Sequence, residues 1–144
     1  MSAIALAPSP AACDVSRPTN DQPRGASLGR PYGNGRLWVG LWPNGVVVFK
    51  RAGPGRINPD GSLTMKFAWW RAVRGRLEIT GRRKDAAAPP LTARIPAGYG
   101  ETGFQSTGLT FASEGCWEVT GRVGAATLTF VTRVVKLANA RGDD

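Results

Sequence analysis

The segment Gly115–Leu137 limits the fold of this chain more than any other. It reads GCWEVTGRVGAATLTFVTRVVKL, two alternating stretches joined by a short turn that contains glycine. Apolar and polar side chains alternate from Cys116 to Thr120, as a half-buried β-strand requires. From Thr127 to Val135 β-branched residues dominate, and these residues also favour strands. The segment therefore predicts a pair of strands near the end of the chain and indicates an all-β protein.

Short strands are also expected through the rest of the chain, because turn-forming residues interrupt it. The 144 residues include 19 glycines and 11 prolines, which leave few windows long enough for a helix. Pro43-Asn44-Gly45 predicts a tight turn that joins two strands in a hairpin, and Asn58-Pro59-Asp60-Gly61 predicts a turn before the next strand. The expected strands before the terminal pair are 37–42, 46–50, 63–70, 77–82, 91–95 and 109–111. Seven or eight short strands at this spacing predict a β-sandwich.

We expect three parts in the chain. Residues 1–35 are rich in proline, glycine and serine and lack a period of two, which predicts an extended or disordered leader. The sandwich is expected at 36–137, followed by a polar tail at 138–144. The opening MSAIALAPSPAAC lacks the basic and long apolar segments of a signal peptide, although Ala11-Ala12-Cys13 resembles a lipoprotein cleavage box. No stretch reaches the ~18 apolar residues of a transmembrane helix.

The two cysteines, Cys13 and Cys116, are candidates for a disulfide between the leader and a core strand. Two thiolates in a chain without histidine supply too few ligands for a zinc site, which needs about four. A disulfide would indicate an oxidising compartment, and therefore a secreted or cell-envelope protein. The alternative is a pair of buried free thiols.

Basic side chains and tryptophans supply the candidate binding site. The net charge is +9, from 19 lysines and arginines against 10 acidic residues. Trp69 and Trp70 are adjacent on one expected strand, so they must point to opposite faces, one into the core and one outward. An outward tryptophan beside arginines can stack sugars or bases while the arginines hold acidic groups. The candidate binding residues are Trp69, Trp70, Arg71, Arg74, Arg76, Arg82, Arg83 and Lys84.

Two plainer interpretations stay open. The arginines can be spread evenly over the surface as a consequence of composition, and all five tryptophans can pack in the core. If the basic surface does bind, the expected partner is an anionic cell-envelope polymer or another protein. Nucleic acid is disfavoured, because no RNA-recognition, KH or helix-turn-helix signature is present.

No catalytic or cofactor site is expected. The lack of histidine excludes Ser-His and Cys-His nucleophiles. Residues 98–103, GYGETG, match the dinucleotide-binding pattern G-x-G-x-x-G, but the segment that follows is too short for the required helix, so turn glycines are expected. Glu78 and Glu118 are the carboxylates that would form a glycosidase pair if a cleft brought them about 5–10 Å apart. We expect a non-enzymatic protein that binds no cofactor and no metal.

Several segments carry a resemblance to known proteins. The octapeptide EGCWEVTG at 114–121 resembles the penultimate strand of immunoglobulin-like domains. The segments YGNGRLWVGLWPNG, DGSLTMKFAWWR, IPAGYG and FQSTGLTFASEGCWEVTGRVG resemble an uncharacterised family of exported bacterial proteins. This resemblance covers about three-quarters of the chain and implies an extracytoplasmic, immunoglobulin-like sandwich, often behind a signal peptide or lipid anchor. It implies no catalytic residues, and this chain departs from it in lacking a clear export signal.

The leading functional hypothesis is a non-enzymatic, extracytoplasmic binding or scaffold module. The second is a structural subunit that assembles through an edge strand or through the leader. The third is an enzyme of the glycosidase kind, which requires the cleft between Glu78 and Glu118.

Overall fold

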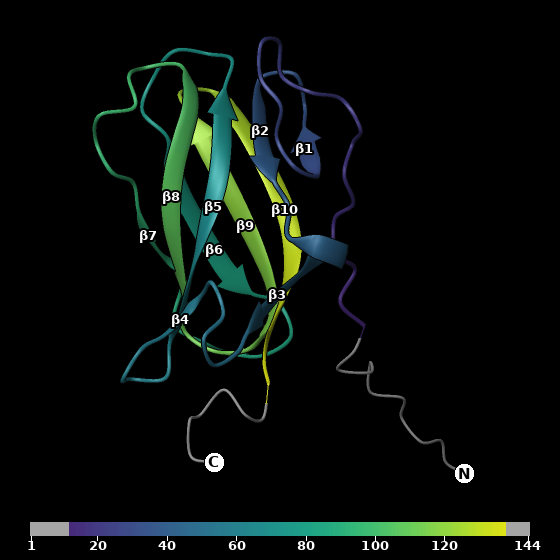
Figure 1. Cartoon of the computed structure of the whole chain (residues 1–144), viewed down its shortest axis with the longest axis vertical. Helices are drawn as coiled ribbons and strands as arrows, with labels where there is room; N and C mark the ends of the chain where they lie inside the picture. The colour runs from purple at the N-terminus through teal and green to yellow at the C-terminus, as the bar shows by residue number, and fades with distance from the viewer. Residues whose placement is uncertain (1–11, 138–144) are drawn as a thin grey trace.

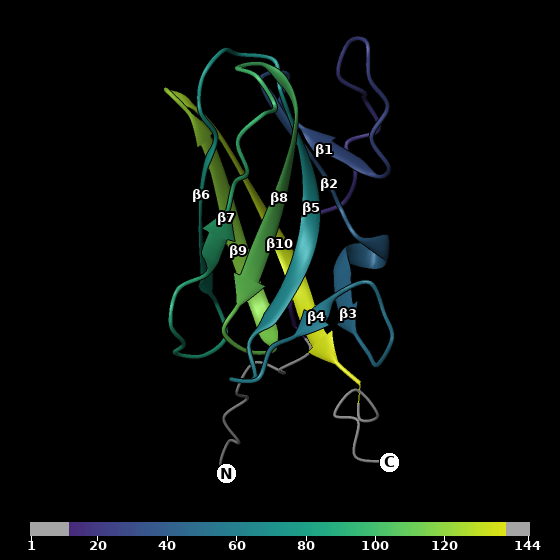
Figure 2. The ribbon, with the colours of Figure 1, turned by 60° about the vertical axis from the view of Figure 1, so that its left-hand side comes forward.

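Two β-sheets pack face to face in the computed structural model, which describes residues 12–137 (Figure 1). The six-stranded sheet has the order β1 (Pro31–Gly33), β2 (Leu37–Gly40), β5 (Leu63–Arg71), β8 (Gly103–Phe111) and β7 (Thr92–Arg94), with β4 (Arg56–Ile57) paired to β5. The four-stranded sheet has the order β3 (Val46–Phe49), β10 (Ala126–Lys136), β9 (Gly115–Val123) and β6 (Glu78–Arg83). Figure 2 shows the two layers from the side. The prediction of an all-β sandwich is confirmed, with ten strands in the described residues.

The core lies between the sheets and is built by the period of two that the sequence shows. In β5, Leu63, Met65, Phe67 and Trp69 are buried, and the residues between them point outward. The ring of Trp69 packs 5.9 Å from that of Phe130 in β10, centroid to centroid. Such packing needs a residue without a side chain in β9, because a Cβ at Gly121 would lie 2.5 Å from the Trp69 ring.

The terminal pair of strands is confirmed. β9 and β10 run antiparallel from Val123 opposite Ala126 to Gly115 opposite Val134. The tight turn between them contains Gly124, whose φ of +58° favours glycine. The predicted turn at 58–61 is also present, between β4 and β5, and Gly61 donates its N–H to the Asn58 carbonyl at 2.9 Å.

The hairpin predicted around Pro43-Asn44-Gly45 is wrong. β2 pairs with β5 in one sheet, whereas β3 pairs in parallel with β10 in the other. Between them, a single 3₁₀ turn, η1 (Pro43–Gly45), directs the chain from one sheet to the other, with positive φ at Asn44 and Gly45. The hydroxyl of Thr132 donates to the Gly45 carbonyl at 2.9 Å and ties this turn to β10.

The sandwich begins before the expected boundary at residue 36. β1 lies within the segment expected as leader, and residues 12–30 form neither helix nor strand but run along the domain, with a turn at 24–25 (Figure 1). Ser16 bonds the β10 backbone twice: its N–H donates to the Val131 carbonyl at 3.0 Å, and its hydroxyl accepts the Val131 N–H at 2.9 Å. Side chains of Tyr32 and Asn34 bond further carbonyls of β10. The leader thus covers a length of the β10 edge that β3 leaves open.

Residues 1–11 and the expected polar tail at 138–144 lie outside the described residues. Within 12–137, none of the helical structure is long and apolar enough to cross a membrane.

Candidate binding face

The two tryptophans of the candidate site point to opposite faces, as the sequence predicts. Trp69 is fully buried in the core, and Arg71, on the same side of β5, is 2% exposed. Trp69 is closed off from solvent, and Arg71, which lines the pocket beside the 98–102 loop, has all five of its N–H groups bonded to backbone carbonyls. Trp70 is the outward member of the pair and is partly exposed. Trp69 and Arg71 are therefore removed from the candidate binding residues.

Arg71 instead holds a loop in place. Its guanidinium donates five hydrogen bonds of 2.9–3.3 Å, one for each of its N–H groups. The acceptors are the backbone carbonyls of Gly75, Tyr99, Gly100, Thr102 and Gly103. Residues 98–102 form the loop before β8, Gly103 is the first residue of that strand, and no helix opens here, as expected for turn glycines. Burial lowers the pKa of the Arg71 guanidinium, and the charge of Glu101 partly opposes this shift.

The other basic candidates are divided between the segment that follows β5 and the end of β6. Arg74 forms an exposed ion pair with Glu101 at 3.0 Å, and Arg76 is exposed at the rim of a pocket of about 450 Å³ beside the 98–102 loop. Arg82 points outward from the four-stranded sheet and is paired with Glu118 at 3.1 Å. The segment 71–84 therefore does not form one basic surface.

Glu78 and Glu118 lie in the same sheet but do not form a carboxylate pair. In the register of β6 and β9, Glu78 lies opposite Arg122 and Glu118 lies opposite Arg82. Four residues of strand separate the two positions, a distance of about 13 Å. This exceeds the spacing of glycosidase carboxylates. The cleft that the glycosidase hypothesis requires is not formed by these two residues.

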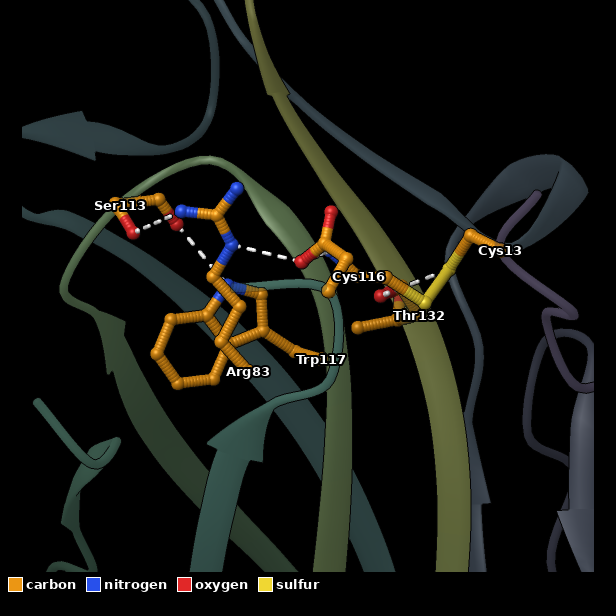
Figure 3. Close-up of polar contacts among 7 residues, drawn as sticks. Cys13, Arg83, Ser113, Cys116, Trp117 and Thr132 are labelled. Atoms are coloured by element: carbon orange, nitrogen blue, oxygen red, sulfur yellow. Dashed lines mark hydrogen bonds and ion pairs between the residues drawn. A yellow bond between two sulfur atoms is a disulfide. The ribbon is translucent and has the colours of Figure 1, made fainter. Parts of the chain in front are cut away.

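The disulfide expected between Cys13 and Cys116 is present at the start of β9 (Figure 3). The two Cα atoms are 5.6 Å apart, although 103 positions separate the cysteines in the sequence. The sulfur of Cys13 lies 4.0 Å from the carbonyl oxygen of Thr132 in β10. The bond therefore attaches the leader to the sheet where β9 and β10 meet, and it leaves neither thiol free.

Arg83 and Lys84 stabilise this attachment point. Asp85 Oδ1 accepts hydrogen bonds from Arg83 Nε at 2.7 Å and from the backbone N–H of Cys116 at 3.1 Å. Arg83 also donates to the Ser113 hydroxyl at 3.3 Å (Figure 3). The backbone N–H of Lys84 donates to the Cys116 carbonyl at 2.6 Å. Arg83 thus links the segment after β6 to the turn between β8 and β9, while the side chain of Lys84 is exposed.

The carboxylate of Asp85 gives this region a pH dependence. Burial alone would raise the pKa of Asp85, but the hydrogen bonds from Arg83 and the Cys116 N–H outweigh it and hold the pKa below its ordinary value of 3.8. The unfolded chain takes up this proton first as the pH falls, so the stabilisation by Asp85 is present above about pH 4 and is lost as the pH falls through the folded pKa.

We therefore expect Asp85→Asn to be less stable than the wild type at pH 7, with the difference narrowing below about pH 4. Urea unfolding of both proteins from pH 7 to pH 2.5 measures this difference. A constant difference over the whole range would contradict the role of the charge.

An exposed aromatic row crosses one end of the outer face of the six-stranded sheet. The register places Trp38 of β2, Trp70 of β5 and Phe104 of β8 side by side, all on the face away from the core. Trp38 is buried, but Phe104 is 43% exposed, and Tyr99, 37% exposed, packs edge-on against it with ring centroids 5.6 Å apart. Trp70, Phe104 and Tyr99 are called the aromatic row below.

Sequence reasoning missed Phe104 and Tyr99. In β8, GFQSTGLTF, an apolar Phe104 looks like a core residue and Gln105 like a surface residue, but the structure has the reverse. Gln105 is buried and its amide donates to the carbonyls of Pro96 and Ser106. A usable signal was present, because counting back by twos from the apolar Phe111 places Gln105 inward and Phe104 outward.

No protein-family model matches this chain, and no curated protein or solved structure matches it significantly. Within residues 12–137, no three acidic or cysteine side chains gather as a metal site would require. The structure alone therefore defines the class of protein. It is a disulfide-bonded β-sandwich with aromatic side chains exposed on one sheet.

Proposed function

We propose that this protein is a non-enzymatic, extracytoplasmic binding module that recognises a glycan through the aromatic row. The observation that carries the proposal is the gathering of Trp70, Phe104 and Tyr99 on the outer face of the six-stranded sheet. Neighbouring exposed aromatic residues are uncommon on a soluble surface unless they meet a partner. A sugar ring has an apolar face of C–H groups that matches an aromatic ring, and its hydroxyls stay in water.

The topology supports an immunoglobulin-like assignment of this module. In chain order, β2, β5, β6, β7, β8, β9 and β10 correspond to the seven strands A to G of a constant-type immunoglobulin domain. Strands A-B-E-D of that domain form one sheet and C-F-G the other, as do β2-β5-β8-β7 and β6-β9-β10 here. The octapeptide at 114–121 then falls on strand F, the strand that it resembles. Here Cys116 of this strand bonds to the leader rather than to strand B.

The disulfide supports an extracytoplasmic location, because such bonds persist in oxidising compartments. It also bears on the alternative of a structural subunit that assembles through its leader. The described part of the leader is bonded to β10 of its own chain. This observation counts against assembly through the leader.

Replacing Trp70 with alanine should weaken glycan binding by about tenfold, if a sugar ring stacks on tryptophan with a free energy within the ~1–3 kcal/mol that a nucleic-acid base gains on an aromatic side chain. The measurement is retardation of the protein in native gels that contain soluble polysaccharides, both neutral and acidic. Phe104→Ala should give a similar loss.

The matched control is Val48→Ala, which removes an exposed apolar side chain from β3 in the other sheet. Its retardation should equal that of the wild type. If no polysaccharide retards the wild type, or if Trp70→Ala and Phe104→Ala bind as well as Val48→Ala, the proposed function is wrong.

A further inference from the structure

The aromatic row borders a floor of small residues. One row further along the strands, Ala68 and Ser106 occupy the outward positions of β5 and β8. Beside them Gly40 of β2 is covered by the leader, because a Cβ at Gly40 would lie 3.1 Å from the Gly29 carbonyl. The short side chains of Ala68 and Ser106 leave room for a chain that lies along β5 and β8. β5 and β8 run side by side over nine paired residues (Figure 1), so the floor continues past this row.

Two basic side chains flank an open space above Gly108 on this floor, which is called the gap below. In the next row, Gly108 of β8 is paired with Lys66 of β5 on one side and with Arg94 of β7 on the other. Both basic side chains are exposed, and no described residue forms an ion pair with either. A Cβ at Gly108 would contact only Thr64 Cγ2, at 3.9 Å, so the space above this glycine is open.

The strands of this face carry basic residues only, although one carboxylate, Asp60 in the turn before β5, lines a hollow at its end with Thr92 and Thr110. The charged residues at its outward strand positions are Arg56, Lys66 and Arg94, with no carboxylate among them. The outer face of the four-stranded sheet differs, because Glu78 and Glu118 lie among its arginines. On the four-stranded sheet Arg82 is paired with Glu118 and Arg122 lies opposite Glu78, whereas no carboxylate lies opposite Lys66 or Arg94 in the described strands of the other sheet.

The spacing fits a polymer better than a small molecule. Trp70 and Lys66 are four residues apart on β5, as are Phe104 and Gly108 on β8, which is about 13 Å along the strands. Lys66 and Arg94 are separated by two strand spacings, about 10 Å, with Gly108 midway. A ligand that reaches both the aromatic row and the gap must extend over two or three sugar rings.

We propose that the glycan is an acidic polysaccharide that lies along β5 and β8. This inference rests on the proposed function. One sugar ring stacks on Trp70 and Phe104, and a carboxylate or phosphate two to three rings away sits over Gly108 between Lys66 and Arg94. Arg56, one row beyond, continues the positive surface for the next acidic group.

The test compares polygalacturonate with its fully methyl-esterified form, which has the same backbone without the charge. The wild type should bind the acidic form at least tenfold more tightly at low salt, and the preference should shrink as added salt screens the charges. A teichoic acid that carries sugar substituents, compared with its free sugar, provides the phosphate arm. A preference for either acidic polymer over its uncharged counterpart supports the inference. The polymer with the stronger preference shows whether the site favours a carboxylate or a phosphate.

Three variants test which residues produce the preference for the acidic polymer. Lys66→Gln with Arg94→Gln should reduce the acidic-over-neutral ratio about tenfold while binding of the neutral form is unchanged. Arg82→Gln with Arg122→Gln removes the same net charge from the other sheet and should keep the ratio. Gly108→Thr keeps every charge but fills the gap, so it should also reduce the ratio.

Equal binding of the acidic and neutral forms, with Trp70→Ala still weakening both, overturns this inference and leaves the proposed function intact. The same holds if the Arg82 and Arg122 variant loses as much preference as the Lys66 and Arg94 variant. If the wild type binds no glycan, both the proposed glycan-binding function and this inference are wrong.

Discussion

Replacing Arg71 with alanine should lower the free energy of unfolding by about 3 kcal/mol or more. The side chain is 2% exposed and makes five hydrogen bonds to backbone carbonyls, so its removal leaves several of these acceptors without a donor. Losing a buried charged donor costs more than losing a neutral one, and stranded acceptors add their desolvation penalty. Urea unfolding followed by tryptophan fluorescence measures the loss.

The matched control is Arg76→Ala, five positions along the chain, where the side chain is exposed. We expect this change to stay within about 0.5 kcal/mol of the wild type. Arg71→Lys should rescue only in part, because an ammonium has three donors and cannot reproduce the planar fork of five. Equal losses for Arg71→Ala and Arg76→Ala would show that the carbonyl contacts contribute no stability.

The Arg71 contacts also connect the core to the aromatic row. The carbonyl of Tyr99 accepts from Arg71 Nη2 at 2.9 Å, and Gly103, immediately before Phe104, accepts from Nε at 3.3 Å. The loop that carries Tyr99 is thus held by a side chain that starts in the sandwich interior. We expect the Arg71→Ala protein, where still folded, to bind glycan more weakly as a consequence.

Sequence reasoning succeeded where the information is local. The alternation around Trp69 and Trp70 predicts which strand carries them and that one must point outward, and the structure selects Trp70. It failed at Pro43-Asn44-Gly45, because turn chemistry specifies a reversal of the chain but not which sheet the next strand joins. That choice is made by the long-range pairing of β3 with β10.

The binding face depends on pairing that no local pattern contains. Lys66, Arg94 and Gly108 are brought together by the registers of β5 with β8 and of β7 with β8, over separations of 14 to 42 positions. The sequence suggested a basic site at 71–84 because its arginines are close along the chain. Strands spread these residues over both sheets, and the burial of Arg71 depends on backbone carbonyls that lie 28 to 32 positions further along the chain.

Removing the disulfide should have the largest effect on stability, a loss of about 4 kcal/mol. The bond closes a loop of 103 positions, and a cross-link of that length restricts the unfolded chain by up to ~4.7 kcal/mol in the entropy model. It also keeps Ser16 beside Val131, where the leader covers the β10 edge. Urea unfolding of the wild type with and without reductant, and of Cys13→Ser with Cys116→Ser, measures the loss.

The control separates the covalent bond from the contacts of the leader. Ser16→Ala in the oxidised protein removes the hydroxyl that accepts the Val131 N–H and should cost only about 1 kcal/mol. If reduction costs no more than Ser16→Ala, the leader is held by its hydrogen bonds and the disulfide is dispensable. If reduction costs several times more, the chain depends on an oxidising compartment for its stability, and the same experiment strengthens the case for export.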